Sequence, residues 1–340
     1  MSELIKINLI ETLSDLGKEL LNPFAELLQI IDQEKQYNAW FTPENVLQAV
    51  QAIGKMLNRT DLEKWLPQNN DTVFTGKKIG LVLAGNIPLV GFHDVLCVLA
   101  SGHFALIKAS ANDSRLISYI LKRLILLEPE FANRYEFTER LVGFDAVMAT
   151  GSNNTSRYFE YYFGKVPNII RKNRNSLAVL SGNETEEELQ KLGHDIFDYF
   201  GLGCRSVSKL LVPEGYDFVE LFRAIESFQP IINHHKYNNN YDYNKSIYLV
   251  NQAKHLDNGF LLLKQDEKIA SPLAVLFYGF YADLDDVNRQ LNQQKEALQC
   301  VVSQMQITAD VPVVGFGESQ RPKLWDYADG VDTMAFLQSI

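Results

Sequence analysis

The sequence predicts an α/β protein in which parallel strands are connected by helices. Three times between residues 78 and 163, a short apolar run is followed by a loop and then by a stretch with helical spacing of apolar residues. This repeat of strand, loop and helix is typical of parallel sheets, whose faces are covered by the connecting helices. The chain has 340 residues, enough for two domains or for one large α/β unit.

The chain opens with a region, to about residue 70, that we expect to be helical. Apolar residues recur at helical spacing from Asn8 to Ile31. Thr42 precedes Pro43-Glu44, an arrangement that predicts a capped start of a further helix. Such helices either pack on the rest of the chain or bind a partner, and we favour a helical cap on the rest of the chain.

The first sheet is expected to begin with the compact apolar run from Lys78 to Ala84, which is typical of a strand buried on both faces. Two further strands are expected at Phe104–Lys108 and Asp145–Thr150. Three helices are expected at Val90–Ser101, Ser114–Leu127 and Thr155–Phe163. Ligands of parallel sheets lie at the carboxyl ends of the strands. A cofactor site is therefore expected at the residues that follow these strands, namely Gly85-Asn86, Lys108-Ala109-Ser110 and Gly151-Ser152. The sequence has no G-x-G-x-x-G dinucleotide fingerprint.

A second α/β pattern follows, and we place the domain boundary near Ser181-Gly182-Asn183, which gives domains 1–181 and 182–340. The strands expected around and beyond this boundary are Ser176–Leu180, Leu210–Val212, Ile247–Val250, Leu273–Tyr278 and Leu298–Ser303. The expected helices are Glu184–Tyr199, Asp217–Ser227 and Leu284–Gln294. The run of three glutamates from Glu186 suits the start of a helix, where negative charge is favourable.

Cys204 is the first candidate for chemistry, because it stands among glycines in the run from Phe200 to Ser206, just before an apolar stretch. A nucleophile must let a carbonyl carbon come within about 3–3.5 Å, and glycines remove side chains that would block that approach. Cysteine is also partly ionised near neutral pH. The alternative is a small buried cysteine that fills a gap in the core. This segment alone does not separate the two interpretations.

Composition excludes several classes of protein. Hydrophobic residues make up 46% of the chain and charged residues 22%, as in ordinary soluble proteins. No apolar run reaches the roughly 20 residues that span a bilayer, and the amino terminus lacks a signal-peptide pattern. The three cysteines are widely spaced, which argues against a disulfide framework and for the cytoplasm. The net charge of −10 disfavours nucleic acid, and no Cys/His set has metal-ligand spacing.

Taken together, several short segments resemble the aldehyde dehydrogenase superfamily, and within it the acyl-CoA reductases of the bioluminescence fatty acid reductase type. The resemblance covers about residues 75 to 335 and rests on five segments: Gly85–Leu89, Gly102–Ser110, Thr150–Ser152, Gly201–Cys204, and the tail with Trp325-Asp326 and Asp329–Asp332. It implies a Rossmann-type cofactor domain and a smaller α/β catalytic domain.

The resemblance also implies roles for individual residues. Cys204 would be the nucleophile, and Asn86 would help to form the oxyanion hole. Lys108, in the element that ends at Ser110, would hold the adenosine ribose of a nicotinamide dinucleotide. Gly151 and Ser152 would cap a helix beneath the pyrophosphate.

Four departures from the family pattern refine this expectation. Hydrolysing members have a catalytic glutamate that activates water, and its expected place, Arg171-Lys172-Asn173, has no carboxylate. A second family glutamate, which holds the nicotinamide ribose, is expected near Lys268. The glutamate that binds the 2′-hydroxyl is replaced by Ala111, so a 2′-phosphate meets no fixed repulsion. NADPH is therefore the expected cofactor, with NAD(H) as the alternative. The chain is also shorter than most members, so the hairpin that builds their oligomers is not assured.

These features predict NADPH-dependent reduction of an acyl-CoA to an aldehyde through an acyl group on Cys204. The alternatives are a hydrolytic aldehyde dehydrogenase, a reductase of phosphorylated acyl groups, and a catalytically silent or partner-dependent protein of the same fold. The resemblance also implies a partner that transfers or activates acyl groups. Neither a metal nor a membrane span is expected.

Other conspicuous residues have more than one interpretation. The polar and aromatic run from His234 to Tyr243 is expected to be a loop that either lines the acyl tunnel or lies on the surface. Arg205 either lowers the pKa of the Cys204 thiol or interacts with solvent, and we favour the second. Residues expected to serve packing or capping are His93, His103, Cys97 and Cys300.

Overall fold

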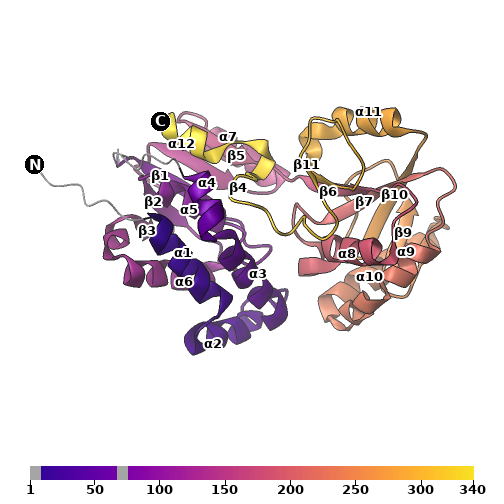
Figure 1. The fold of residues 1–340 in the computed structure, drawn as a ribbon, viewed down its shortest axis with the longest axis horizontal. Helices are drawn as coiled ribbons and strands as arrows, with labels where there is room; N and C mark the ends of the chain where they lie inside the picture. Colours follow the sequence, from indigo (N-terminus) through magenta and orange to yellow (C-terminus); the bar gives the residue numbers. More distant parts are fainter. Residues whose placement is uncertain (1–8, 67–75) are drawn as a thin grey trace, which may run out of the picture. The chain divides into compact units, whose positions relative to one another are not determined.

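The structure, a computed structural model, describes residues 9–66 and 76–340, and its chain forms two compact units (Figure 1). The first comprises Met1–Asn173 and Pro322–Ile340, and the second comprises Arg174–Arg321. This division differs from the boundary expected near Ser181–Asn183, because the strand that begins at Asn175 pairs with the second sheet. The tail, expected in the second domain, returns to the first unit.

Four helices open the first unit, as the sequence predicts, apart from positions 1–8 and 67–70, which lie outside the described residues. They are α1 (Leu9–Leu21), α2 (Ala25–Gln33), α3 (Pro43–Met56) and α4 (Arg59–Trp65). The Thr42 side chain accepts a hydrogen bond from the amide of Asn45 at 3.4 Å, so the predicted cap of α3 is confirmed. Gly17 of α1 lies against Leu57 so closely that an added Cβ would be 2.9 Å from the Leu57 Cβ.

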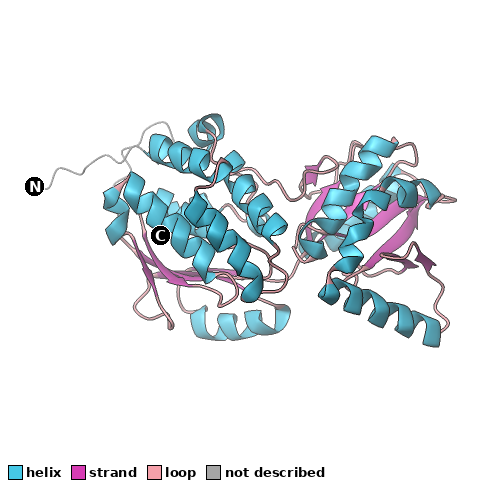
Figure 2. Ribbon diagram, turned by 90° about the horizontal axis from the view of Figure 1, so that it is seen from below, coloured by secondary structure: helices cyan, strands magenta, loops and turns pink. Residues whose placement is uncertain are grey.

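The sheet of the first unit is parallel, with strand order β3-β2-β1-β4-β5. Its strands are β1 (Lys78–Val82), β2 (Phe104–Lys108), β3 (Tyr135–Phe137), β4 (Ala146–Thr150) and β5 (Asn168–Arg171). Helices α5 (Phe92–Ala100), α6 (Ser114–Leu127) and α7 (Asn153–Phe163) connect them, and helices lie on both sides of the sheet (Figure 2). Because β1 is central, the apolar run that predicted it is buried between the two layers.

The second unit contains a larger sheet with strand order β12-β11-β6-β7-β10-β9-β8, in which only the β8–β9 pair is antiparallel. The strands are β6 (Asn175–Val179), β7 (Val207–Pro213), β8 (Leu256–Asp257), β9 (Leu262–Gln265), β10 (Val275–Tyr281), β11 (Leu298–Val302) and β12 (Val313–Val314). The helices are α8 (Glu186–Phe197), α9 (Val219–Ala224), α10 (His235–Val250) and α11 (Leu284–Gln294). Successive residues of β7 face opposite cores: Leu210 and Val212 join one apolar cluster and Leu211 the other.

Helix α10 corrects two expectations, because both the His234–Tyr243 loop and the Ile247–Val250 strand belong to it. The His234 side chain caps the helix by accepting from the Tyr237 amide at 3.4 Å. Buried side chains then recur at helical spacing, at Tyr237, Tyr241, Asn244 and Tyr248. Asparagine-rich sequence has low intrinsic helix propensity, so burial of the tyrosines decides the conformation here.

The tail of the chain adds helix α12 (Thr333–Gln338) to the first unit, where it packs on α5. The rings of His93 and His103 contact the tail carbonyls of Leu324 and Leu337, each at 2.9 Å. Trp65 donates from its indole nitrogen to the Tyr327 hydroxyl at 2.9 Å. The two histidines thus anchor the tail, in line with their expected packing role.

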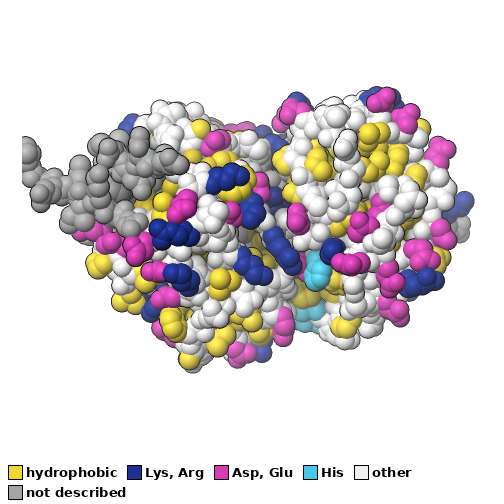
Figure 3. Space-filling view, viewed as in Figure 1, with side chains coloured by type: hydrophobic (Ala, Val, Ile, Leu, Met, Phe, Trp, Pro, Cys, Tyr) yellow, Lys and Arg dark blue, Asp and Glu magenta, His cyan; other side chains and the backbone are white. Residues whose placement is uncertain are grey.

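The surface carries mixed charge. On the face shown in Figure 3, Lys and Arg side chains are interspersed with Asp and Glu and with apolar side chains. Within residues 9–66 and 76–340, no helix is both long and apolar enough to cross a bilayer. The same residues contain no group of three or more His, Cys, Asp or Glu side chains arranged to hold a metal ion.

Candidate functional site

Cys204 lies on a tight turn between α8 and β7. After α8 the backbone takes three successive left-handed conformations, with φ of 54° at Tyr199, 60° at Phe200 and 74° at Gly201. Left-handed backbone is unfavourable for residues with a Cβ, so the two aromatic residues need the surrounding packing to hold them there. Both aromatic side chains are buried. The reversed chain then presents residues 203–206 immediately before β7.

The turn from Gly203 to Ser206 is closed by two reciprocal hydrogen bonds. The Ser206 amide donates to the Gly203 carbonyl at 3.0 Å, and the Gly203 amide donates to the Ser206 hydroxyl oxygen at 3.2 Å. From β6, the Ser176 hydroxyl donates to the Cys204 carbonyl at 3.0 Å. Cys204 itself is half-buried and forms no disulfide. Neither closing bond of the turn uses the Cys204 amide or its thiol, so the turn fixes the residue through its neighbours.

A second cysteine lies behind this turn. Cys300 of β11 is fully buried, and its Sγ is 3.1 Å from the Ser176 Oγ. Burial raises the pKa of the Cys300 thiol, and the Arg205 guanidinium opposes that shift. Arg205 therefore acts electrostatically on Cys300, a partner that sequence reasoning did not consider. Cys97, on α5, is also buried, as expected of a core thiol, and burial raises its pKa well above the ordinary value.

Asn86 is exposed on the loop that connects β1 to α5 in the first unit. Leu89 in this loop has a left-handed φ of 59°, and its amide donates to the Asp113 carboxylate at 2.6 Å. Gly85 lies so close to the loop after β2 that an added Cβ would be 2.4 Å from the Ser110 Oγ. The loops after β1 and β2 are thus packed together, and only glycine fits at position 85.

Asp113 is a residue that sequence reasoning missed. It is 1% exposed, and burial raises its pKa well above the ordinary value, although the Leu89 amide opposes the shift. It occupies the N-cap position of α6 but makes no side-chain cap there, because it binds the Leu89 amide instead. An aspartate before a helix predicts a cap, so only the structure reveals that it holds the Asn86 loop.

The remaining predicted residues lie at the same edge of the sheet. Lys108 ends β2 and is exposed, and Ser110 follows it. Ser152 caps α7, because its hydroxyl oxygen accepts from the Thr155 amide at 3.2 Å. An added Cβ on Gly151 would be 2.9 Å from the Phe159 ring, so the chain enters α7 closely packed. A capped helix start at the carboxyl end of a parallel strand suits an anionic group such as a phosphate.

A cavity of about 810 Å³ adjoins this edge in the first unit. It is bounded by α2, by α6 and by the segments after β2 and β3, and Ser110 and Ala111 contribute to its wall. The volume lies in the range of small-molecule sites. Arg115 in the wall pairs with Glu34, Nη1 to Oε1 at 3.2 Å, so this guanidinium is already committed to a protein carboxylate.

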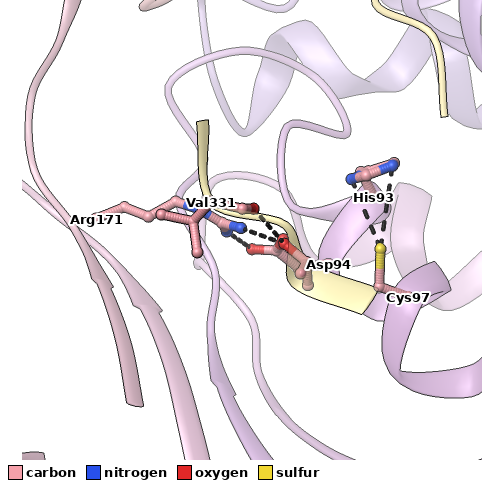
Figure 4. A network of polar contacts seen from close by, with 6 residues as sticks. His93, Asp94, Cys97, Arg171 and Val331 are labelled. Atoms are coloured by element: carbon pink, nitrogen blue, oxygen red, sulfur yellow. Dashed lines mark hydrogen bonds and ion pairs between the residues drawn. The ribbon is translucent and has the colours of Figure 1, made fainter. Parts of the chain in front are cut away.

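Arg171, the first residue of the segment Arg171-Lys172-Asn173 in which the family resemblance places a glutamate, ends β5 and is 4% exposed (Figure 4). It forms an ion pair with Asp94 of α5 and donates to the Thr333 hydroxyl oxygen at 3.1 Å. Burial alone would lower the Arg171 pKa, but the pKa is raised, because the charge and hydrogen bond of Asp94, with smaller contributions from Asp329 and Cys97, favour the charged guanidinium. The position therefore holds a permanently charged arginine that joins α5 to the tail.

The loop near Lys268, where the second family glutamate is expected, is held from β7. The Lys209 ammonium donates to the Glu267 carbonyl at 2.7 Å, and the Ser208 hydroxyl donates to the Ile269 carbonyl at 2.9 Å. Burial lowers the pKa of Lys209. A lysine within a buried strand was a signal of such a contact that sequence reasoning did not use.

The structure thus gathers Asn86, Lys108, Ser110, Gly151 and Ser152 at the carboxyl edge of one sheet, in the first unit. Cys204 belongs to the second unit, where Ser176 and Ser206 hold its turn.

Comparisons with known proteins define the fold. No protein-family model and no curated protein matches the sequence. Among solved structures, aldehyde dehydrogenase 21 from Physcomitrella patens is similar with a TM-score of 0.67 and 13% identity, over 97% of this chain and 83% of that one. An NAD-dependent aldehyde dehydrogenase from Sinorhizobium meliloti is similar with a TM-score of 0.61 and 12% identity, over 89% of this chain and 73% of that one.

An acetylating aldehyde dehydrogenase from Geobacillus thermoglucosidasius is also similar, with a TM-score of 0.59 and 9% identity over 96% of this chain and 88% of that one. The protein therefore has the aldehyde dehydrogenase fold, which confirms the fold class predicted from the sequence. At such low identity, the likeness establishes the fold alone.

Proposed function

We propose that the protein reduces an acyl-CoA thioester to an aldehyde with NADPH, through an acyl group carried on Cys204. The observation that supports the proposal is the buried Arg171, in the segment Arg171-Lys172-Asn173 where the resemblance places the glutamate that activates water in hydrolysing aldehyde dehydrogenases; this segment has no carboxylate. A buried arginine locked to Asp94 cannot accept a proton from water. An acyl-cysteine in such an enzyme is reduced or transferred rather than hydrolysed.

The nucleophilic step uses the turn described above. The Cys204 thiolate adds to the thioester carbonyl and gives a tetrahedral oxyanion, which collapses by breaking the bond to the coenzyme A sulfur and releases coenzyme A as the thiolate. In the family that the sequence resembles, an asparagine side chain and the amide of the cysteine bind the developing oxyanion, and we assign these roles to Asn86 and Cys204 from that resemblance. One such donor typically lowers the barrier by about 2.7–4 kcal/mol.

The residues at the carboxyl edge of the first sheet fit a nicotinamide dinucleotide. Ser152 and the capped start of α7 would bind its phosphates, and Lys108 with Ser110 would bind the adenosine ribose. Ala111 provides no carboxylate against a 2′-phosphate, which favours NADPH, with NAD(H) as the alternative. The bound cofactor supplies the hydride that reduces the acyl carbon. Cys204 then leaves as the thiolate when the aldehyde forms.

Two further features belong to the proposal. One structural neighbour is named an acetylating aldehyde dehydrogenase, and such thioester chemistry fits the lack of a hydrolytic base at Arg171. We also propose a cytoplasmic location and an acyl-transferring or acyl-activating protein partner, as in the bioluminescence-type reductases that the sequence resembles. The alternatives are a hydrolytic aldehyde dehydrogenase, which the segment Arg171-Lys172-Asn173 argues against, a reductase of phosphorylated acyl groups, and a silent or partner-dependent protein.

The test is turnover with NADPH and saturated acyl-CoAs of several chain lengths, in which loss of NADPH absorbance and release of free thiol are followed together. The proposal predicts equal rates of both, and their loss in Cys204→Ala with NADPH binding retained. Turnover by Cys204→Ala would disprove the role of the thiol. No turnover by the wild-type protein, with no acyl group on Cys204, would favour the silent or partner-dependent alternative.

A further inference from the structure

The Cys204 turn is supported from a distant part of the chain by the segment Gly315–Arg321, here called the strap. The Gln320 side chain donates from Nε2 to the Ser206 hydroxyl oxygen at 3.1 Å. The same oxygen accepts from the Gly203 amide at 3.2 Å. Ser206 is 3% exposed, so both bonds are shielded from water. Gln320 therefore fixes the rotamer of the side chain that closes the turn.

The strap is itself rigidly held. Two successive turns build it, with amide-to-carbonyl bonds from Glu318 to Gly315 at 3.3 Å and from Arg321 to Glu318 at 2.9 Å. The carboxylate of Asp195 on α8 accepts from the amides of Gly317 at 2.6 Å and Ser319 at 2.9 Å. Asp195 is fully buried. A buried carboxylate that binds two amides places the strap against α8 with little freedom.

Gly317 explains how closely the strap approaches α8. Its φ is +81°, and an added Cβ would be 3.3 Å from the Lys191 Cβ and 3.4 Å from the Lys191 carbonyl. A residue with a side chain would therefore be strained in this backbone conformation and crowded against the helix. The contacts that hold the strap against α8 are therefore separate from the Gln320–Ser206 bond.

We propose that Gln320 is a positioning residue for Cys204, acting through the Ser206 hydroxyl, and that Asp195 holds the strap that presents it. This inference rests on the proposed function, in which Cys204 attacks a thioester carbonyl. Attack on a carbonyl requires the sulfur and the oxyanion donors to be aligned together. Alkylation by a small reagent requires only an accessible thiolate. Loss of positioning should therefore slow acylation more than alkylation.

The experiment compares wild type with Gln320→Met, which keeps the length of the side chain but removes the donor. Acylation is measured in single turnover with a saturated acyl-CoA and no NADPH, as the mass gained by the Cys204 peptide. Alkylation of the same peptide by iodoacetamide is measured across pH. We expect acylation to fall about 3- to 10-fold, the effect of one neutral hydrogen bond, with alkylation changed less than about twofold.

Gln290→Met is the matched control. Gln290 lies on α11 of the same unit, and its side chain donates to the Phe280 carbonyl of β10 at 3.4 Å. The control variant should leave both rates as in wild type. Gln320 acts only through Ser206 in this account, so Ser206→Ala and the double variant Ser206→Ala/Gln320→Met should be acylated at the same rate. If Ser206→Ala fails to fold, the ratio of the two rates in Gln320→Met decides alone.

The outcomes separate the two proposals. If wild type is acylated at Cys204 and Gln320→Met is acylated equally fast, the positioning role is wrong and the proposed function stands. Equal slowing of acylation and alkylation, or additive losses in the double variant, would also overturn the positioning role. If wild type takes no acyl group on Cys204, the proposed function fails and this inference fails with it.

Discussion

Replacing Arg171 by methionine tests the ion pair at the end of β5. The change leaves the Asp94 carboxylate, 8% exposed as a residue, without its partner, and it removes the 3.1 Å bond to Thr333. An uncompensated buried charge of this kind costs about 3–5 kcal/mol of the free energy of unfolding. With a urea slope of about 2–3 kcal/mol per M, the unfolding midpoint should fall by about 1–2.5 M.

Tryptophan fluorescence is the natural assay, because the three tryptophans of the chain, Trp40, Trp65 and Trp325, all belong to the first unit. It therefore reports the unfolding of the unit that contains the pair. The double variant Asp94→Leu/Arg171→Met leaves neither charge, so its midpoint should recover most of the loss. A midpoint shift in Arg171→Met below about 0.5 M, or a double variant less stable than Arg171→Met, would refute the reasoning.

Two further predictions concern stability, measured by tryptophan fluorescence in the first unit and by circular dichroism in the second. The raised pKa of Asp113 means that its carboxyl keeps a proton in the folded protein at pH values where the unfolded chain has lost it. Its contribution to stability is complete below the ordinary value of 3.8 and is lost as pH rises through the raised pKa. Asp113→Asn keeps an acceptor for the Leu89 amide but does not titrate. The free energy of unfolding of this variant, relative to that of wild type, should therefore rise from acid to neutral pH, and a difference independent of pH would contradict this. In the second unit, Thr185 and Glu188 form a capping box at the start of α8, and Thr185→Ala should cost about 1 kcal/mol by circular dichroism in urea; no change would show that the cap is not needed.

Much of the fold could be predicted because its central strands are continuous apolar runs. The predicted strand Phe104–Lys108 matches β2, and the predicted helices Ser114–Leu127 and Leu284–Gln294 match α6 and α11. Burial on both faces of a parallel sheet demands such runs, so the sequence pattern and the fold agree. The edge strands β3 and β5 are short and partly polar, and they were missed for that reason.

Helix α10 and the tail could not be predicted for different reasons. The asparagine-rich run of α10 has weak helix propensity, and its conformation depends on burial of Tyr237 and on the bond from its hydroxyl to the Phe260 carbonyl at 3.0 Å. The return of the tail to the first unit depends on contacts between residues more than 200 positions apart, such as His103 with Leu337. Local patterns carry no information about such contacts.

The candidate site was predictable in part. Glycines and polar residues after buried strands indicated the loops of Asn86, Lys108 and Ser152, because strand ends meet at one edge of a parallel sheet. The supporting residues were not predictable. Ser206, Gln320 and Asp113 act through hydrogen bonds to loops, and no residue pattern distinguishes them from ordinary polar residues.

The most direct test of the central claim is to mix the protein with a saturated acyl-CoA without NADPH and to locate the added mass by peptide mass spectrometry. We expect one acyl group on the Cys204 peptide, stable against water because Arg171 provides no base, and converted to aldehyde when NADPH is added. An acyl group on Cys97, on Cys300 or on no cysteine would contradict the account. So would release of the free acid without NADPH at the rate at which aldehyde forms with NADPH.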